Sequence, residues 1–251
     1  MSDALFQSLL RLGDNTLILG HQVSAWCGIG PVLEEDIALA NIALDLLGQT
    51  QMWLGLAAEI EQAGRSPDDL AMLRDVHDFR NILLVEQPNG DYGRTIMRQY
   101  LFDQFHFLQL QKLASSTHEQ IAEIAAKSLK EVTYHLRRSG DTVIALGDGT
   151  AESHMRMQTA LDRLWPFIGE MFIADHIDED MARAEIMPNP ADLRADYNKA
   201  IQHTLSDATL QLPDSDFAHK GGRTGVRHSE HLGHLLTQMQ WMQRAYPGAH
   251  W

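Results

Sequence analysis

Cysteine is nearly absent from this sequence, because Cys27 is the only one in 251 residues. One thiol excludes an intrachain disulfide and any metal site built from cysteines alone, and it suits a reducing compartment. The first residues, MSDALFQSLLRLGDNTLILGHQ, carry charges and glycines where a signal peptide needs an apolar segment. We therefore predict a cytoplasmic protein. Cys27 also has no matched histidine and acid nearby, which gives nucleophilic catalysis little support.

Basic residues are scarce relative to acidic ones. The chain has 20 Lys and Arg against 34 Asp and Glu, a formal net charge of −14. This balance repels nucleic acid phosphates and anionic membrane surfaces. Apolar runs long enough to span a bilayer are also missing. We therefore expect neither a nucleic acid partner nor a membrane partner.

Strand signals are few, whereas apolar residues recur at alternating steps of three and four along most of the chain. This periodicity predicts an all-α protein. Without a repeat, a low-complexity segment or a linker, we predict one helical domain over residues 1–251. The predicted helices cover residues 5–26, 32–64, 67–80, 92–114, 119–146, 152–173, 190–206 and 229–246, and ILLVEQPNGDYG is predicted to be an irregular connection.

Four of these helices are long, which favours an elaborated four-helix bundle with additional shorter helices. The helix over 32–64 has two apolar seams, one through Leu39, Leu46 and Trp53 and the other through Ile37, Leu44 and Leu54, as expected at the centre of a bundle. The helix over 119–146 is lined by small residues and should pack closely. The helix over 152–173 should bend or break near Pro166, where one backbone hydrogen bond is lost.

The segment KEVTYH, from Lys130 to His135, most resembles a metal-binding motif. Di-iron bundles place a Glu from each of two helices and a Glu-x-x-His pair from each of the other two in the core. Here Glu131 lies four residues before His135, and Val132 occupies the position three before it. Val132 and His135 share an apolar stripe, so an isopropyl group stands where the bridging carboxylate belongs.

The other long helices supply few further ligands. Leu46 lies three residues before Gln49, with Asp45 four before it, and the first helix has Leu17 with only Asp14 nearby. Asp103 is the one acid on its stripe, whereas His106 lies off that stripe, which leaves its burial open. Asp103 and His135 are good metal ligands and Gln49 is a poor one. Together these three side chains supply too little anionic oxygen for two iron ions. We expect a buried, hydrogen-bonded polar cluster of Asp103, His135 and Gln49, although their binding of a metal stays open.

Two other motifs are weaker. The segment HSEHLGHLL has His228, His231 and His234 three apart, but these positions diverge around a helix, and the order differs from that of zinc proteases. We interpret it as the start of a helix with solvent or partner contacts. GGRTGVR lacks the Gly-Lys-Ser/Thr ending and the preceding strand of a phosphate loop, so we predict a glycine-rich surface loop.

The sequence resembles the C subunits of bacterial phenylacetyl-CoA epoxidases. The resembling segments are LRLGDN from Leu10, IALANIALDLLGQ from Ile37, NILLVEQPNG from Asn81, RQYLFD from Arg98, KEVTYHLRRS from Lys130, and HSEHLGHLLTQMQWMQR from His228. The resemblance implies a ferritin-like bundle that pairs with a catalytic A subunit of similar fold. In that family the A subunit holds the di-iron centre and epoxidises the aromatic ring of the coenzyme A thioester, using oxygen and electrons from a reductase.

The resemblance also implies a subunit that kept the fold and lost the metal. The apparent ligand positions hold Leu17, Leu46, Gln49 and Val132, while Asp103 and His135 could still ligate iron. We therefore predict a non-catalytic structural subunit in a hetero-oligomer with the A subunit and other components of the complex. No catalytic, cofactor-binding or metal residue is assigned to this chain, and the di-iron centre is expected in the partner.

Two alternatives stay open at this point. One is an independent metal-dependent oxidase or oxygenase with an atypical site of Asp103, His135, Gln49 and Glu131. The other is a binding protein whose bundle interior takes up an apolar ligand. Metal analysis would separate the first from a structural subunit, and stabilisation by a ligand would favour the second.

Overall fold

The computed structural model describes residues 2–249, and these residues form helices, turns and loops with no strand. The prediction of an all-α protein is confirmed, and the long helices are those of a ferritin-like helical bundle. The chain divides into two compact units, residues 1–88 with 220–251 and residues 89–219. This division does not test the predicted single domain, which stays a prediction. In the described part of the chain, no helix is long and apolar enough to cross a membrane.

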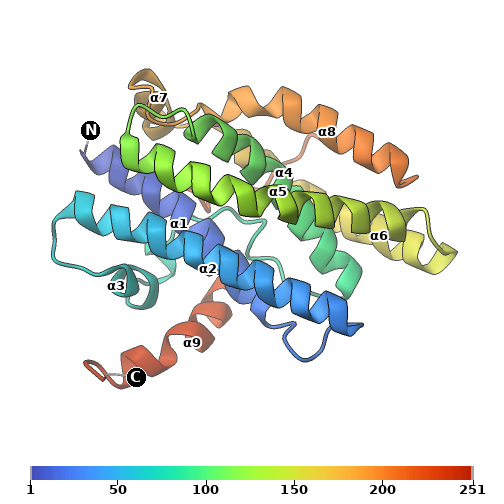
Figure 1. Cartoon of the computed structure of the whole chain (residues 1–251), viewed down its shortest axis with the longest axis horizontal. Helices are drawn as coiled ribbons and strands as arrows, with labels where there is room; N and C mark the ends of the chain where they lie inside the picture. Colours follow the sequence, from blue (N-terminus) through green and yellow to red (C-terminus); the bar gives the residue numbers. More distant parts are fainter. Residues whose placement is uncertain (1, 250–251) are drawn as a thin grey trace. The chain divides into compact units, whose positions relative to one another are not determined.

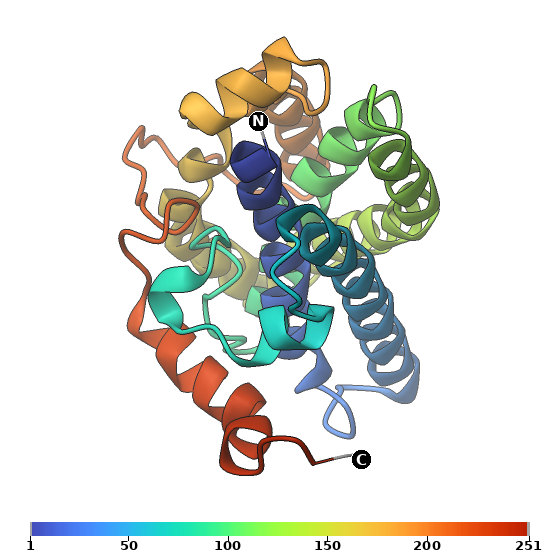
Figure 2. The same cartoon turned by 90° about the vertical axis from the view of Figure 1, so that its left-hand side faces the viewer.

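The first unit is built on an antiparallel pair of long helices, α1 (Ser2–Ser24) and α2 (Leu33–Glu61), which lie side by side in Figures 1 and 2. Two glycines of α1 allow their close approach. A Cβ on Gly13 would lie 2.5 Å from Leu54 Cδ2, and one on Gly20 would lie 3.2 Å from Leu46 Cβ. Thr16 and Thr50 share a buried hydrogen bond of 2.8 Å between their hydroxyl groups. The two helices therefore meet along an apolar seam closed by small side chains.

One apolar seam of α2 is buried as predicted, with Leu39, Leu46 and Trp53 fully covered. The second seam is not buried along its whole length. Leu54 is buried, but Ile37 is 52% exposed and Leu44 is 67% exposed. The expectation that α2 lies at the centre of a bundle is therefore wrong for this part of its surface, because none of the described residues covers it.

The rest of the first unit packs around this pair. The predicted helix over 67–80 is shorter than expected: α3 (Pro67–Met72) ends, and a separate 3₁₀ turn, η1 (Val76–Asp78), follows. The break has a local cause, because the backbone N–H of Asp75 bonds to the Asp78 carboxylate at 3.0 Å and starts the new turn. The C-terminal helix α9 (Glu230–Ala245) lies beside α3 and η1, as Figure 2 shows in red and teal.

The second unit is built on a second helical pair, α4 (Tyr92–Leu113) and α5 (Glu119–Gly147). The small residues predicted to line α5 are buried, among them Ala125, Ser128 and Ser139, and a Cβ on Gly140 would touch the Tyr100 ring at 3.5 Å. The predicted break near Pro166 is confirmed. It ends α6 (Ala151–Leu164) and leaves two 3₁₀ turns, η2 (Trp165–Phe167) and η3 (Gly169–Phe172).

Two short helices complete the second unit. The 3₁₀ turn η4 (Pro190–Leu193) leads into α8 (Arg194–Asp207), whose Tyr197 hydroxyl donates to the Leu101 carbonyl of α4 at 3.1 Å. The helix α7 (His176–Arg183) was not predicted from the sequence. Asp175 caps this eight-residue helix by accepting from the backbone N–H groups of Ile177 and Asp178.

Candidate functional site

A buried polar cluster lies where α4 packs on α5. Asp103 is fully buried, and both of its carboxylate oxygens accept hydrogen bonds. Gln99 Nε2 donates to Oδ1 at 2.6 Å, and Ser139 Oγ donates to Oδ2 at 2.8 Å. Gln99 is one turn before Asp103 on α4, while Ser139 comes from α5. The hydrogen bond from Ser139 to Asp103 therefore joins the two helices.

Helical spacing brings these side chains together. On α5, Val132, His135 and Ser139 are three and four residues apart, so they share one face, and all three are buried. The prediction that Val132 and His135 face the same seam is thus confirmed. Val132 is 0% exposed, while Glu131 lies at the partly exposed edge of the helix. An isopropyl group occupies the core position at which a di-iron bundle would need its bridging acid.

His106 is buried as well, with 2% of its surface exposed, which settles what its position in the sequence left open. Burial, together with the neighbouring His135, lowers the pKa of His106 to about 3. The ring is therefore neutral near pH 7. Its contact partner is Phe102, with ring centroids 5.0 Å apart, so an aromatic neighbour shields this face of α4 from water.

Burial raises the pKa of Asp103 to about 6, against the opposing effects of His135 and of the hydrogen bonds from Ser139 and Gln99. The carboxyl group thus changes its charge close to neutral pH. Chemically, the cluster offers one carboxylate, whose oxygens are both engaged, and two imidazoles. Among residues 2–249, no group of three or more His, Cys, Asp or Glu side chains is arranged to hold a metal ion. This donor set does not fit a carboxylate-bridged di-iron centre.

The other positions singled out in the sequence lie in the first unit. Leu17, Leu46 and Gln49 are all buried there, at 3%, 0% and 0% exposure. A single cluster of Gln49 with Asp103 and His135 stays a prediction, because each unit is described by itself.

Asp14, the carboxylate nearest to Leu17 in the sequence, is committed elsewhere. It forms a buried ion pair with Arg74 and accepts the backbone N–H of Arg80 at 2.8 Å. The Arg74 guanidinium also lies over the Phe79 ring, with its Cζ 4.4 Å from the centroid. Asp14 therefore holds the segment after α3 against α1.

A second buried network was not foreseen. Glu86, fully buried in the irregular connection, accepts from Asn81 Nδ2 at 2.9 Å and from the Ser229 backbone N–H and hydroxyl at 2.7 and 2.6 Å. His228 Nδ1 bonds to the same carboxylate, and its Nε2 lies 3.2 Å from the Phe79 carbonyl oxygen. The expected solvent or partner contact is therefore wrong for His228, whose side chain is 1% exposed.

The only hint of this network in the sequence is a carboxylate inside the apolar segment ILLVEQ. Because an ionised group in such a segment is costly without partners, Glu86 implied a partner that the local sequence does not contain. The glycine-rich loop before His228 is part of the same packing. A Cβ on Gly222 would lie 2.5 Å from the Asn81 carbonyl oxygen. The loop thus packs against the irregular connection and is not only a surface loop.

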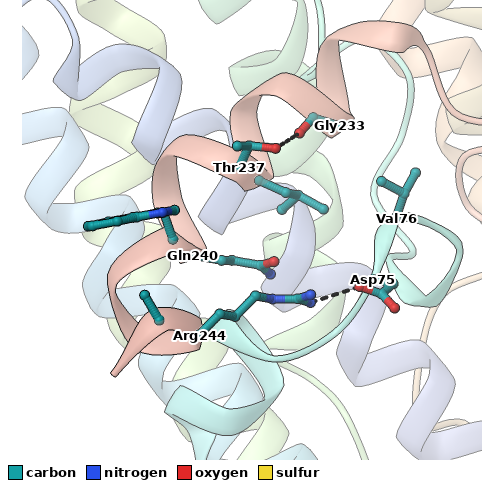
Figure 3. A pocket seen from close by; sticks show the side chains of 9 residues that line it. Asp75, Val76, Gly233, Thr237, Gln240 and Arg244 are labelled. Atoms are coloured by element: carbon teal, nitrogen blue, oxygen red, sulfur yellow. Dashed lines mark hydrogen bonds and ion pairs between the residues drawn. The ribbon is translucent and has the colours of Figure 1, made fainter. Parts of the chain in front are cut away.

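A pocket of about 440 Å³ opens between α9 and the turn at Asp75 and Val76 (Figure 3). Its polar side chains bind the chain itself. Arg244 pairs with Asp75 at 2.9 Å, and Gln240 donates to the carbonyl oxygens of Ala71 and Arg74 at 3.0 and 3.1 Å. These contacts fix α9 in place, which gives the pocket a structural explanation.

Comparison of the sequence with known proteins identifies the family of this chain. The family model described as "Phenylacetic acid catabolic protein" matches residues 1–251. The chain belongs to this family. A curated relative, the C subunit of the 1,2-phenylacetyl-CoA epoxidase of Escherichia coli (strain K12), is 45% identical over 242 residues, which cover 96% of this chain and 97% of the relative.

Membership of the phenylacetic acid catabolic family confirms the resemblance drawn from the sequence segments and assigns the chain to phenylacetate catabolism. The match runs through both helical pairs and the C-terminal helix. The buried Glu86 network and the Asp103 cluster therefore both lie within the region that the family model covers.

Proposed function

We propose that this chain is a non-catalytic structural subunit of a multicomponent phenylacetyl-CoA 1,2-epoxidase, and that it stabilises the di-iron catalytic A subunit in the aerobic degradation of phenylacetate. The relative named as the C subunit of such an epoxidase, which matches almost the whole chain, supports this assignment. The complex acts in the cytoplasm, a location that the single cysteine suits.

The observation that carries the proposal is the chemistry of the α4 and α5 core. Val132 is fully buried at the position of a bridging acid, and Asp103 uses both oxygens to bind Gln99 and Ser139. Such a core favours a helical scaffold over a redox centre, because two iron ions need several unengaged carboxylates. We assign no catalytic, cofactor-binding or metal residue to this chain and place the di-iron centre in the A subunit.

The competing function is an independent oxygenase whose site uses Asp103, His135, Gln49 and Glu131. The burial of a carboxyl group and an imidazole in one core, with Asp103 and His135 both 0% exposed, is the observation in its favour. It would need Asp103 to exchange a hydrogen bond for a metal bond. The two functions therefore differ in what Asp103 is required to do.

The test measures iron content and activity. The chain produced alone with iron supplied should contain close to no iron, and it should raise the yield and thermal stability of the A subunit when the two are combined. Asp103→Asn should leave turnover of the combined enzyme unchanged, as should the control Asp141→Asn, which changes an exposed acid of α5. About two irons per chain, with turnover by the chain alone that Asp103→Asn abolishes, would establish the competing function; loss of turnover in the assembled Asp103→Asn complex would overturn the proposed function.

A further inference from the structure

The outer face of α2 is an apolar surface that the described chain leaves uncovered. We define it by Leu33, Ile37, Leu44 and Leu47, which are 71%, 52%, 67% and 36% exposed. With Ala40 between them, their spacing is four, three, four and three residues, the heptad spacing of a helix that packs along another helix. α1 packs on the adjoining face of α2, and Leu47 lies at the border, because a Cβ on Gly20 would be 3.4 Å from Leu47 Cγ. The outer face therefore has the pattern of a helix–helix contact without the second helix.

Two glycines mark the same face. Gly48 and Gly55 lie within roughly 40° of Leu44 at about 100° per residue. A Cβ on either would have no neighbouring atom within 4 Å. Glycine within a helix is destabilising, and nothing in the described chain requires it here.

A second glycine pair occurs in α1, where it faces α2. Gly13 and Gly20 are also seven residues apart, and there they let α2 approach α1 closely. The same spacing recurs on the outer face of α2, where Gly48 and Gly55 leave room for the close approach of another backbone.

The acidic residues of α2 limit which partner can bind its outer face. No Lys or Arg occurs between Arg11 and Arg65, while α2 carries the acids Glu34, Glu35, Asp36, Asp45, Glu59 and Glu61. A second copy of this chain would bring two acidic surfaces together, which costs free energy. A helix whose apolar stripe is flanked by Lys and Arg is complementary to the outer face.

We propose that the outer face of α2 docks a helix of the catalytic A subunit, with an apolar stripe flanked by basic residues and closest approach at Gly48 and Gly55. The proposal rests on the proposed function and specifies the surface through which it acts. The loop before α2 extends the surface with Ile29 and Val32, which are 68% and 54% exposed. Asp36 holds this loop by accepting the backbone N–H groups of Gly28 and Gly30 at 2.8 and 2.9 Å.

The experiment measures the affinity of the full-length chain for the purified A subunit of the same organism by calorimetry. Leu44→Asp places a charge in the stripe, and Gly48→Leu fills the space left for the partner backbone without removing any contact in the chain. Each should weaken binding by at least about 30-fold, the effect of losing a central interface residue. The control Met155→Asp changes a side chain of α6 that is 61% exposed, and it should bind like the wild type.

Circular dichroism and the melting temperature check that each variant is folded, and Gly48→Leu should melt no lower than the wild type. Binding of both variants within threefold of the wild type would overturn the docking surface while leaving the proposed function intact. Failure of the wild-type chain to bind the A subunit would overturn both. A wild-type homodimer that Leu44→Asp dissociates, with unchanged binding of the A subunit, would assign the face to a second copy instead.

Discussion

Replacing Asp103 by asparagine tests whether burial controls the charge of the α4 and α5 cluster. Burial raises the pKa of this carboxyl from 3.8 to about 6. The folded protein then holds the proton more tightly than the unfolded chain does. The free energy of unfolding therefore falls as the pH rises from about 4 to about 6 and stays lower above that range. A shift of this size corresponds to about 3 kcal/mol, at roughly 1.4 kcal/mol per pKa unit.

Asparagine at position 103 removes the cost of burying an ionised carboxylate and keeps the shape of the side chain. Its amide oxygen can accept from Ser139, and its amide NH₂ can donate to Gln99 Oε1, a buried atom with no hydrogen-bond partner in the described structure. Asp103→Asn should therefore raise the free energy of unfolding by about 3 kcal/mol at pH 7.5 and by close to nothing below pH 4.

Urea unfolding followed by far-ultraviolet circular dichroism at pH 3.5, 5 and 7.5 measures the change in the free energy of unfolding caused by Asp103→Asn and its dependence on pH. The control Asp141→Asn removes an exposed acid of α5, so it should change stability little at any of these pH values. A lower free energy of unfolding for Asp103→Asn than for the wild type at pH 7.5 would contradict a burial penalty on the ionised carboxylate. A difference in the free energy of unfolding that is the same at all three pH values would contradict a raised pKa of Asp103.

Three further variants probe the first unit. Glu86→Gln should lower the free energy of unfolding by about 3–5 kcal/mol in urea titrations, because its amide NH₂ would face the donors of His228 and Ser229. Leu46→Ala, at a fully buried site, should lower it by about 2–5 kcal/mol through the cavity that it leaves. Gly48→Ala should raise the stability of the chain alone by up to about 1 kcal/mol, measured as a higher melting temperature.

Matched controls accompany these variants. Glu123→Gln changes an exposed acid, so a loss equal to that of Glu86→Gln would show that the buried network is not the cause. A loss below about 1 kcal/mol in Leu46→Ala would mean that the core refills the cavity. Gly13→Ala is the counterpart of Gly48→Ala and should be destabilising, because its Cβ would lie 2.5 Å from Leu54 Cδ2. Equal effects of the two alanines would contradict the assignment of Gly48 to an open surface.

The long helices could be predicted because their signal is local. The apolar stripe of Val132, His135 and Ser139 follows from spacing alone, and the burial of these side chains agrees with it. Spacing also identified Val132 as the residue in place of an acid. The break after α6 followed from Pro166, whose ring prevents a regular helix wherever the rest of the chain lies.

The remaining features depend wholly or partly on partners far away in the sequence. Glu86 and His228 are separated by 142 residues, and no local pattern joins them. The expected helix over 67–80 ended early because Arg74 turns inward to pair with Asp14 and a new turn starts at Asp75. Two apolar seams on α2 indicated burial on both sides, but apolar spacing is the same for a seam that this chain buries and for one that it leaves exposed, such as Ile37 and Leu44.

The first unit is formed by both ends of the chain, so it can be completed only late in synthesis. Residues 89–219 must be made before residues 220–251 can complete that unit. At about 5–20 residues per second, this interval lasts on the order of ten seconds, during which Glu86 lacks both His228 and Ser229. Until then, Asn81 is the one of these three partners that is present to bond to the Glu86 carboxylate. The last residues to emerge close the part of the protein that was made first.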